Sequence, residues 1–296
     1  MLPKELLKEI KRIEIKTRCL VDSVYSGGYR SVFKGQGIEF SGIREYSRGD
    51  EFRSIDWKVT ARTGNLHIRE HVEERELQVV IALDLSGSMS FGSGSREKRE
   101  TAVEFAAAIG MSAAENHDRF GILMFTDHVE KYSAPAKGKT HLLRLIRDLL
   151  YFVPKEKNTD FKPVFHLLNN SLRHKSVIFL VSDFLDCQNF EREMKITAAR
   201  HDLIAVKIRD RREIELPDVG LIELEDPETG EESLLDTSNR QRVSELSDLI
   251  RRMDTKFRSF AEKIGVDFVE LTAGESVSKP IIALFNRRTR RFSSSG

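Results

Sequence analysis

The segment Val79-Val-Ile-Ala-Leu-Asp84-Leu-Ser86-Gly87-Ser88-Met89 decides the fold class of this chain. Its unbroken apolar run, without the alternation of a half-exposed strand, predicts a strand that is buried on both faces. Such strands are typical of parallel sheets with helices on both sides. Asp84 follows the run and is expected at the end of the strand, with Ser86 and Ser88 in a turn that Gly87 opens.

From Leu77 onward the remaining sequence alternates strand and helix patterns. Strands are predicted at 77–83, 120–125, 177–181, 203–208 and 267–271, and helices at 98–116, 141–152, 161–172, 190–199, 243–264 and 277–288. This alternation predicts an α/β fold with a doubly wound, mainly parallel sheet. Turn signals such as Pro217-Asp and Thr229-Gly interrupt it, and an inserted β-hairpin is expected over 213–237.

Two further segments flank this α/β domain, which we place at residues 77–288. Residues 1–76 begin with a charged helix at 1–16, and frequent glycines after residue 17 predict a small β-rich module. Residues 289–296 are basic and then Ser-rich, so we expect a flexible tail.

The composition favours an ordinary soluble protein. The chain has 48 Lys and Arg against 47 Asp and Glu, and its net charge of +1 gives no overall attraction to nucleic acid or an anionic membrane. No apolar run approaches the roughly 18–20 residues of a transmembrane helix, and no signal peptide is evident. Cys19 and Cys187 lie far apart in sequence, which favours reduced thiols. We therefore expect a cytoplasmic protein without a transmembrane segment or a nucleic-acid partner.

Oxygen-bearing side chains are predicted at one edge of the sheet. Thr159 precedes the helix at 161–172, and Asp183 follows the strand at 177–181. Because the carboxyl ends of parallel strands meet at the same edge, these side chains can converge with the loop after the first strand. Carboxylate and hydroxyl oxygens suit Mg²⁺ (or Mn²⁺) that keeps some of its waters. The candidate metal ligands are Asp84, Ser86, Ser88, Thr159 and Asp183.

Two simpler interpretations compete with the metal site. Asp84 would then only cap the helix that begins at Lys98, and Asp160 would cap the helix that begins at Phe161. The agreement of three separate segments favours the metal for Asp84, whereas the capping role is the better interpretation for Asp160.

Asp84-Leu-Ser86-Gly-Ser88 resembles the metal-ion-dependent adhesion site of von Willebrand factor A domains. That site consists of an Asp-x-Ser-x-Ser loop, a distant Thr and a distant Asp, for which Thr159 and Asp183 are the natural matches. The resemblance covers roughly residues 77–272. It implies that the hydroxyls touch the metal, that the two aspartates hold it directly or through waters, and that an acidic residue of a partner fills an open position.

A second resemblance rests on residues 37–63. The segments Gly37-Ile-Glu-Phe-Ser-Gly-Ile-Arg44-Glu45-Tyr-Ser-Arg48-Gly-Asp50 and Arg53-Ser-Ile-Asp56-Trp57-Lys58 look like the signature of the bacterial family known as domain of unknown function 58. Its members are typically encoded beside MoxR-type AAA+ ATPases, which implies such an ATPase as a partner. The paired charges themselves favour a network that joins the module to its neighbour over a docking surface.

Other chemistries find less support. Gly138-Lys139-Thr140 lacks the preceding glycine of a phosphate-binding loop, and Ser86 lacks the flanking glycines of a serine hydrolase. The histidines show no zinc-type spacing in a helix. A metal-assisted phosphohydrolase at the same site is the alternative, although no nucleophile can be assigned. The sequence predicts a non-enzymatic, chaperone-like adaptor that binds an unidentified protein client with a MoxR-type ATPase, in the assembly or maturation of protein complexes.

Overall fold

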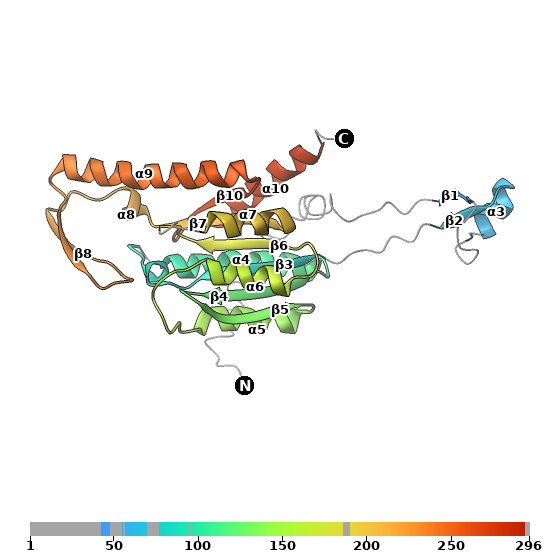
Figure 1. Ribbon diagram of the computed structural model, residues 1–296, viewed down its shortest axis with the longest axis horizontal. Coiled ribbons are helices and arrows are strands. Elements are labelled where there is room, and N and C mark those ends of the chain that lie inside the picture. The colour runs from blue at the N-terminus through green and yellow to red at the C-terminus, as the bar shows by residue number, and fades with distance from the viewer. Residues whose placement is uncertain are drawn as a thin grey trace.

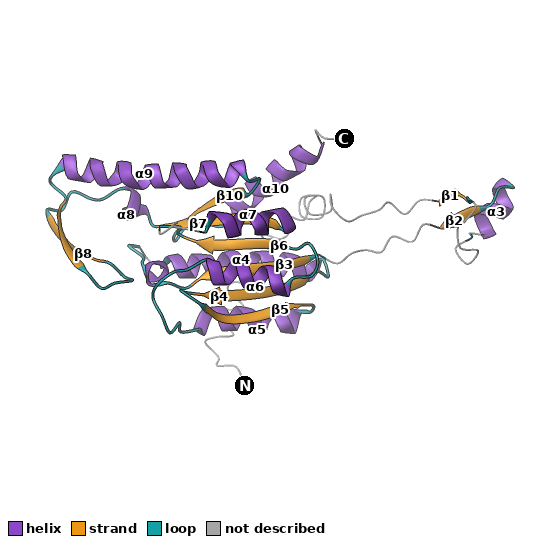
Figure 2. Cartoon of the chain, in the orientation of Figure 1, coloured by secondary structure: helices purple, strands orange, loops and turns teal. Residues whose placement is uncertain are grey.

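The computed structural model describes residues 43–47, 55, 57–69, 77–94, 96–185 and 190–293 (Figures 1 and 2). The helix predicted at 1–16 and much of the module at 17–76 lie outside these residues. Within the module, strands β1 (Ile43–Glu45) and β2 (His67–Arg69) form an antiparallel pair. Whether the module is β-rich throughout stays a prediction.

Helix α3 (Trp57–Thr63) lies between β1 and β2 in sequence and was not predicted. Gly64 ends it with a φ of 79°, and its N–H donates to the carbonyl of Thr60 at 3.0 Å. A left-handed glycine just past a helix is a common stop signal. Trp57 is 65% exposed. Because Arg48, Asp50, Arg53 and Asp56 lie outside the described residues, the charged network stays a prediction.

The main sheet has six strands and confirms the predicted fold class. Its members are β3 (Gln78–Asp84), β4 (Arg119–Phe125), β5 (Val129–Ala136), β6 (Val177–Ser182), β7 (Asp202–Arg209) and β10 (Asp267–Thr272). They lie in the order β10-β7-β6-β3-β4-β5. All neighbours are parallel except β4 and β5. Residues 79–83 of the central strand β3 are all buried, as their apolar run predicted, and Asp84 at its end is buried as well.

Helices cover both faces of this sheet, as a doubly wound fold requires. One face carries α4 (Lys98–Glu115), α5 (Lys139–Tyr151) and α10 (Ser278–Ser293). The other carries α6 (Lys162–Ser171), α7 (Glu191–Arg200) and α9 (Arg240–Lys263). Helix α10 continues to Ser293, beyond residue 288 where the sequence placed the end of the domain. None of the helices described here combines the length and apolarity that crossing a membrane requires.

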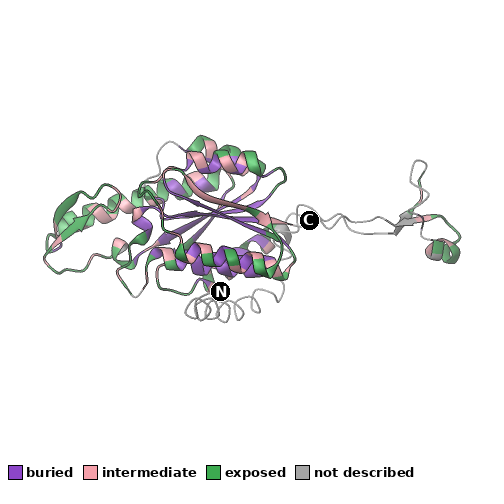
Figure 3. Ribbon diagram, turned by 90° about the horizontal axis from the view of Figure 1, so that it is seen from below, coloured by how far each residue is buried: buried purple, intermediate pink, exposed green. Residues whose placement is uncertain are grey.

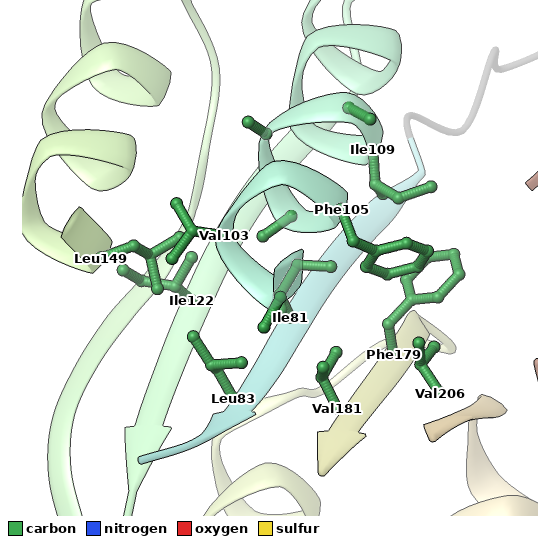
Figure 4. Close-up of a cluster of buried hydrophobic side chains, with 14 of the residues drawn as sticks. Ile81, Leu83, Val103, Phe105, Ile109, Ile122, Leu149, Phe179, Val181 and Val206 are labelled. Carbon is green, nitrogen blue, oxygen red and sulfur yellow. The ribbon is translucent and has the colours of Figure 1, made fainter. Parts of the chain in front are cut away.

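Two hydrophobic cores hold the helices to the sheet (Figure 3). On the α4 face, the rings of Phe105 and Phe179 meet edge to face at 5.6 Å beside Ile81 of the central strand (Figure 4). Complete burial of one such side chain contributes about 1.5–3 kcal/mol to folding. The central strands are therefore fixed from both sides, which gives their carboxyl ends defined positions.

Strand β5 is the strand of the sheet that the sequence pattern did not predict. It lies at the edge, and its residues are partly exposed and include Lys131, Ser133 and Pro135. Proline is tolerated at an edge because no further strand needs its missing N–H. The register against β4 shifts at Gly121, where an added Cβ would lie 2.8 Å from the carbonyl oxygen of Ser133.

The insertion between β7 and α9 contains an antiparallel hairpin within the range 213–237 that the sequence suggested. It consists of α8 (Arg211–Ile214) and the antiparallel strands β8 (Leu221–Glu225) and β9 (Glu232–Asp236). The residues of these two strands are mostly exposed. The hairpin turn spans 226–230, where the N–H of Gly230 donates to the carbonyl of Asp226 at 2.7 Å.

Candidate metal centre

The candidate site lies at the carboxyl ends of β3 and β6, the two neighbouring strands at the centre of the sheet. From β3 the chain continues to β4 and β5 on one side, and from β6 to β7 and β10 on the other. Open α/β sheets bind ligands at such a switch point. Leu83 pairs with Val181, so Asp84 lies level with Ser182, and Asp183 follows. Both carboxyl groups belong to buried residues.

Each carboxylate oxygen of Asp84 accepts a hydrogen bond. Oδ1 accepts from the N–H of Ser86 at 2.9 Å, and Oδ2 accepts from the hydroxyl of Ser182 at 2.7 Å. Burial and then the negative charge of Asp183 raise the pKa of Asp84 to about 7, although these hydrogen bonds lower it. Two buried carboxyl groups at neighbouring strand ends form a favourable environment for a cation.

The two serines of the predicted site belong to a short turn directly after β3. Ser86 precedes the 3-10 helix η2 (Gly87–Ser90), and Ser88 lies within it. Both are buried, and their hydroxyl oxygens are 3.2 Å apart. The N–H of Gly87 donates to the carbonyl of Lys157 at 2.8 Å, which holds the loop before α6 against this turn. The structure therefore places Ser86 and Ser88 beside Asp84.

Thr159 lies in that adjoining loop, and its hydroxyl donates to Oε1 of Glu228 at 3.1 Å. Glu228 belongs to the hairpin turn of the insertion. Thr159 therefore makes no hydrogen bond to Asp84, Ser86 or Ser88. It is connected to the turn after β3 indirectly, through the backbone of its own loop and through the hairpin turn. Asp160 accepts from the N–H of Lys162 at 2.9 Å. The N-cap position of α6 is occupied by Phe161 and not by Asp160, so the predicted capping role of Asp160 was wrong by one residue.

Asp183 has a cationic partner that the sequence did not reveal. Lys98 is fully buried at the start of α4, and its ammonium donates to Asp183 at 2.7 Å and to Glu213 of α8 at 2.5 Å. Burial opposes the charge of Lys98, but the two carboxylates outweigh it and the pKa of Lys98 is raised. These partners are 85 and 115 residues distant in sequence, so no local pattern indicates them.

A group of phenylalanine rings lies next to the site. Phe184 follows Asp183 with a φ of 50°, and its ring stacks on Phe257 of α9 with centroids 4.4 Å apart. It also stacks on Phe161, which follows Asp160, at 5.7 Å. Left-handed backbone at a bulky residue costs about 1–3 kcal/mol, which this packing offsets. The rings thereby fix the backbone that carries Asp183.

The donor set fits a hard divalent cation. It combines two carboxylates with three hydroxyls, from Asp84, Asp183, Ser86, Ser88 and Thr159. Across the described ranges, no three His, Cys, Asp or Glu side chains cluster in a way that could hold a metal. Oxygen donors of low total charge suit Mg²⁺ or Mn²⁺ better than zinc. That these residues bind a metal stays a prediction.

Comparison with known proteins identifies the family. A family model described as "Protein of unknown function DUF58" matches residues 42–254. Uncharacterized proteins of Mycobacterium bovis and Mycobacterium tuberculosis are each 32% identical to this chain over 228 residues, which cover 76% of this chain and 72% of theirs.

Similarity to solved structures is weaker. The conserved hypothetical protein BatB from Bacteroides thetaiotaomicron aligns with a TM-score of 0.49 and 12% identity, over 72% of this chain and 99% of BatB. The SpRpn10 VWA domain aligns with a TM-score of 0.40 and 11% identity, over 70% of this chain and 94% of that domain. The fold class rests on the strand order given above and not on these scores. The family model and the mycobacterial relatives together show that the chain belongs to the DUF58 family.

Proposed function

We propose that this protein is a non-enzymatic, metal-dependent adaptor for protein–protein interaction. Mg²⁺ or Mn²⁺ at the carboxyl ends of β3 and β6 would bind an acidic residue of a partner. The observation that carries the proposal is the placement of Asp84 and Asp183, two buried carboxyl groups at the switch point of the sheet, beside two serine hydroxyls. A divalent cation would relieve the repulsion between these carboxylates.

The charge balance at the site favours an acidic partner. When both are ionised, Asp84 and Asp183 carry two negative charges, and Lys98, which Asp183 shares with Glu213, offsets part of them. The hydroxyls of Ser86, Ser88 and Thr159 add no charge. A divalent ion held by this set keeps excess positive charge, so a carboxylate of the partner gains binding energy at an open position.

Family membership supports the wider role. The resemblance of residues 37–63 implies a MoxR-type AAA+ ATPase as one partner, and the second partner would be a protein client. In our proposal the adaptor acts in the cytoplasm, where it joins client and ATPase during the assembly or maturation of protein complexes.

Thermal unfolding tests whether the site holds a metal. At 100 times its dissociation constant, a ligand adds about 2.7 kcal/mol, which is a rise of about 5–10 °C in Tm for a domain near 200 residues. We expect this rise with Mg²⁺ or Mn²⁺ relative to chelator, and its loss in Asp84→Ala. Asp248→Ala, an exposed aspartate on α9, is the matched control and should respond like the wild type. An equal rise in Asp84→Ala would contradict the assignment.

Binding to the ATPase tests the adaptor role. Ser86→Ala combined with Ser88→Ala removes both hydroxyls and leaves the carboxylates in place. We expect the purified MoxR-type ATPase of the same organism to be captured by the wild type with Mg²⁺, and much less by the double variant or with chelator. Equal capture in all three cases would exclude a metal-bridged contact.

The phosphohydrolase remains the alternative function because a carboxyl group with a pKa near 7 is frequent at catalytic sites. Turnover of generic phosphoesters that Asp84→Asn abolishes would favour the enzyme over the adaptor. The adaptor proposal predicts no turnover in either protein.

A further inference from the structure

The hairpin turn of the insertion lies directly on the turn that carries Ser86 and Ser88. A Cβ added to Gly87 would be 2.3 Å from the carbonyl oxygen of Pro227, a distance that no side chain permits. Only glycine allows two backbones to approach this closely. Glu228, the next residue, is half-buried and accepts the hydrogen bond from Thr159. The chain thus places one of its own carboxylates within one hydrogen bond of a candidate metal ligand.

The root of the insertion, which we define as Asp210 and α8, is also attached to the site. Glu213 accepts a hydrogen bond from Lys98, whose ammonium also binds Asp183. Asp210 accepts from the N–H of Ser93 at 2.9 Å and from its hydroxyl. The insertion therefore contacts the site at its root and at its turn, while the strands between these two contacts are mostly exposed.

We propose that Glu228 is an internal ligand of the metal centre. Its carboxylate would take the position that an acidic residue of a partner needs, so that the hairpin turn must leave before the partner binds. This inference rests on the proposed metal site. A tethered carboxylate acts at an effective concentration in the millimolar range, and it excludes partners that bind the metal only weakly. A cation at the site would attract the carboxylate of Glu228, so the metal would hold the turn in place.

Bound Mn²⁺ can show whether Glu228 occupies a coordination position of the metal. The effect of Mn²⁺ on water-proton relaxation increases with the number of exchangeable waters that the ion holds, and a carboxylate ligand displaces such a water. Glu228→Gln keeps the size of the side chain and removes the charge. We expect weaker Mn²⁺ binding, higher relaxivity per bound ion, and about tenfold or more tighter binding of an N-acetylated peptide with a single glutamate. Glu231→Gln, an exposed glutamate next to the same turn, is the matched control and should behave like the wild type.

A second pair of variants moves the turn and leaves Glu228 intact. Gly87→Ala forces the Pro227 backbone away, whereas Gly94→Ala, also in the segment between β3 and α4, points into open space. We expect Gly87→Ala, but not Gly94→Ala, to raise the relaxivity and the affinity for the peptide. Circular dichroism and the Tm of each variant show that it is folded.

The outcomes separate the two proposals. If the wild type binds no Mn²⁺, or Asp84→Ala binds it equally well, both the metal site and the internal ligand are overturned. If Mn²⁺ binding depends on Asp84 but Glu228→Gln and Gly87→Ala match the wild type in relaxivity and peptide affinity, only the internal ligand is overturned.

Discussion

Lys98 shows how one buried residue can connect separate segments. Its ammonium joins the end of β6, through Asp183, to the root of the insertion, through Glu213. Removal of one partner from a buried ion pair leaves a carboxylate without compensation and is typically destabilising by about 3–5 kcal/mol. Lys98 therefore contributes to the position of a candidate ligand as well as to stability.

We expect Lys98→Met to lower the free energy of unfolding by about 3 kcal/mol in chelator, measured by urea denaturation. Lys195→Met, which replaces an exposed lysine on α7, should change it by less than about 0.5 kcal/mol. Adding Glu213→Gln to Lys98→Met should restore part of the loss. Equal effects of the two lysine substitutions would contradict this role for Lys98.

His201 makes the free energy of unfolding depend on pH. The residue is 3% exposed, and its Nε2 has no hydrogen-bond partner among the residues that the structure describes. Burial, with the charges of Arg200 and Lys175, lowers the pKa of His201. In the unfolded chain the group takes up a proton near pH 6.5, whereas the folded protein resists this until lower pH. Its contribution to stability is therefore present above about pH 6.5 and is lost as the pH falls below it.

We expect the free energy of unfolding, measured from pH 8 to pH 5, to decrease less steeply in His201→Gln than in the wild type. The exposed His166 on α6 provides the control, because His166→Gln should leave the slope unchanged. Identical slopes in the wild type and His201→Gln would show that His201 is not responsible.

At the scale of elements, β4 and β5 depend on a close backbone approach at Gly121. Strand propensity alone favours Gly121→Ala, because glycine inside a strand is destabilising by roughly 0.5–1 kcal/mol. The added methyl group, however, would lie 2.8 Å from both the Ser133 carbonyl oxygen and the Pro135 nitrogen. Backbone atoms give way less easily than a flexible side chain, and overpacking typically costs about 1–3 kcal/mol.

We therefore expect Gly121→Ala to destabilise the protein by about 1–3 kcal/mol in urea denaturation. Gly94→Ala serves as the comparison because nothing lies near its Cβ. A gain in stability from Gly121→Ala would show that strand propensity prevails and that the edge strand can move.

The sequence predicted the elements that burial determines. Residues 79–83 of β3 and 177–181 of β6 are all apolar because both faces of the sheet are covered, and this pattern is visible without tertiary information. β5 has one open edge and a mixed pattern, so its pairing with β4 could not be inferred from periodicity. Helix α3 was missed for another reason, since its glycine stop at Gly64 is also an ordinary turn signal.

The candidate site, too, combines residues that the sequence indicated with residues that only tertiary contacts reveal. Asp84, Ser86 and Ser88 are neighbours in sequence, so their spacing alone indicated an oxygen-rich turn after a strand. Lys98 and Glu228 were not predicted, because a lone lysine at a helix start and a glutamate in a hairpin turn are unremarkable by themselves. Their importance depends on contacts across 69 or more residues of sequence, which only the packing of the insertion against the sheet creates.

For the molecule as a whole, α10 attaches the C-terminal part of the described chain to the sheet edge. Arg288 is 6% exposed and binds Asp202 of β7 and Asp267 of β10, both at 2.7 Å. The two carboxylates raise the pKa of Arg288 against the effect of burial. Arg291 also binds Asp267, at 3.0 Å, but its side chain is 70% exposed.

This contrast provides a matched pair of substitutions. Arg288→Ala should lower the free energy of unfolding by about 3 kcal/mol, whereas Arg291→Ala should lower it by less than about 1 kcal/mol. Global unfolding in urea, followed by circular dichroism, measures both. Similar losses would mean that burial of the ion pair at the sheet edge adds nothing to its contribution.

Helix α9 also has a mechanical consequence. Its 24 residues span about 36 Å, and its described buried residues, Phe257 and Ala261, lie in its C-terminal half. The N-terminal half follows the hairpin and extends away from the sheet (Figure 1). Since Phe257 stacks on Phe184 beside Asp183, a tilt of about 5° at this pivot would displace the far end by about 2 Å. A small repacking at the carboxyl ends of the strands would thereby be amplified at the hairpin by a rigid lever.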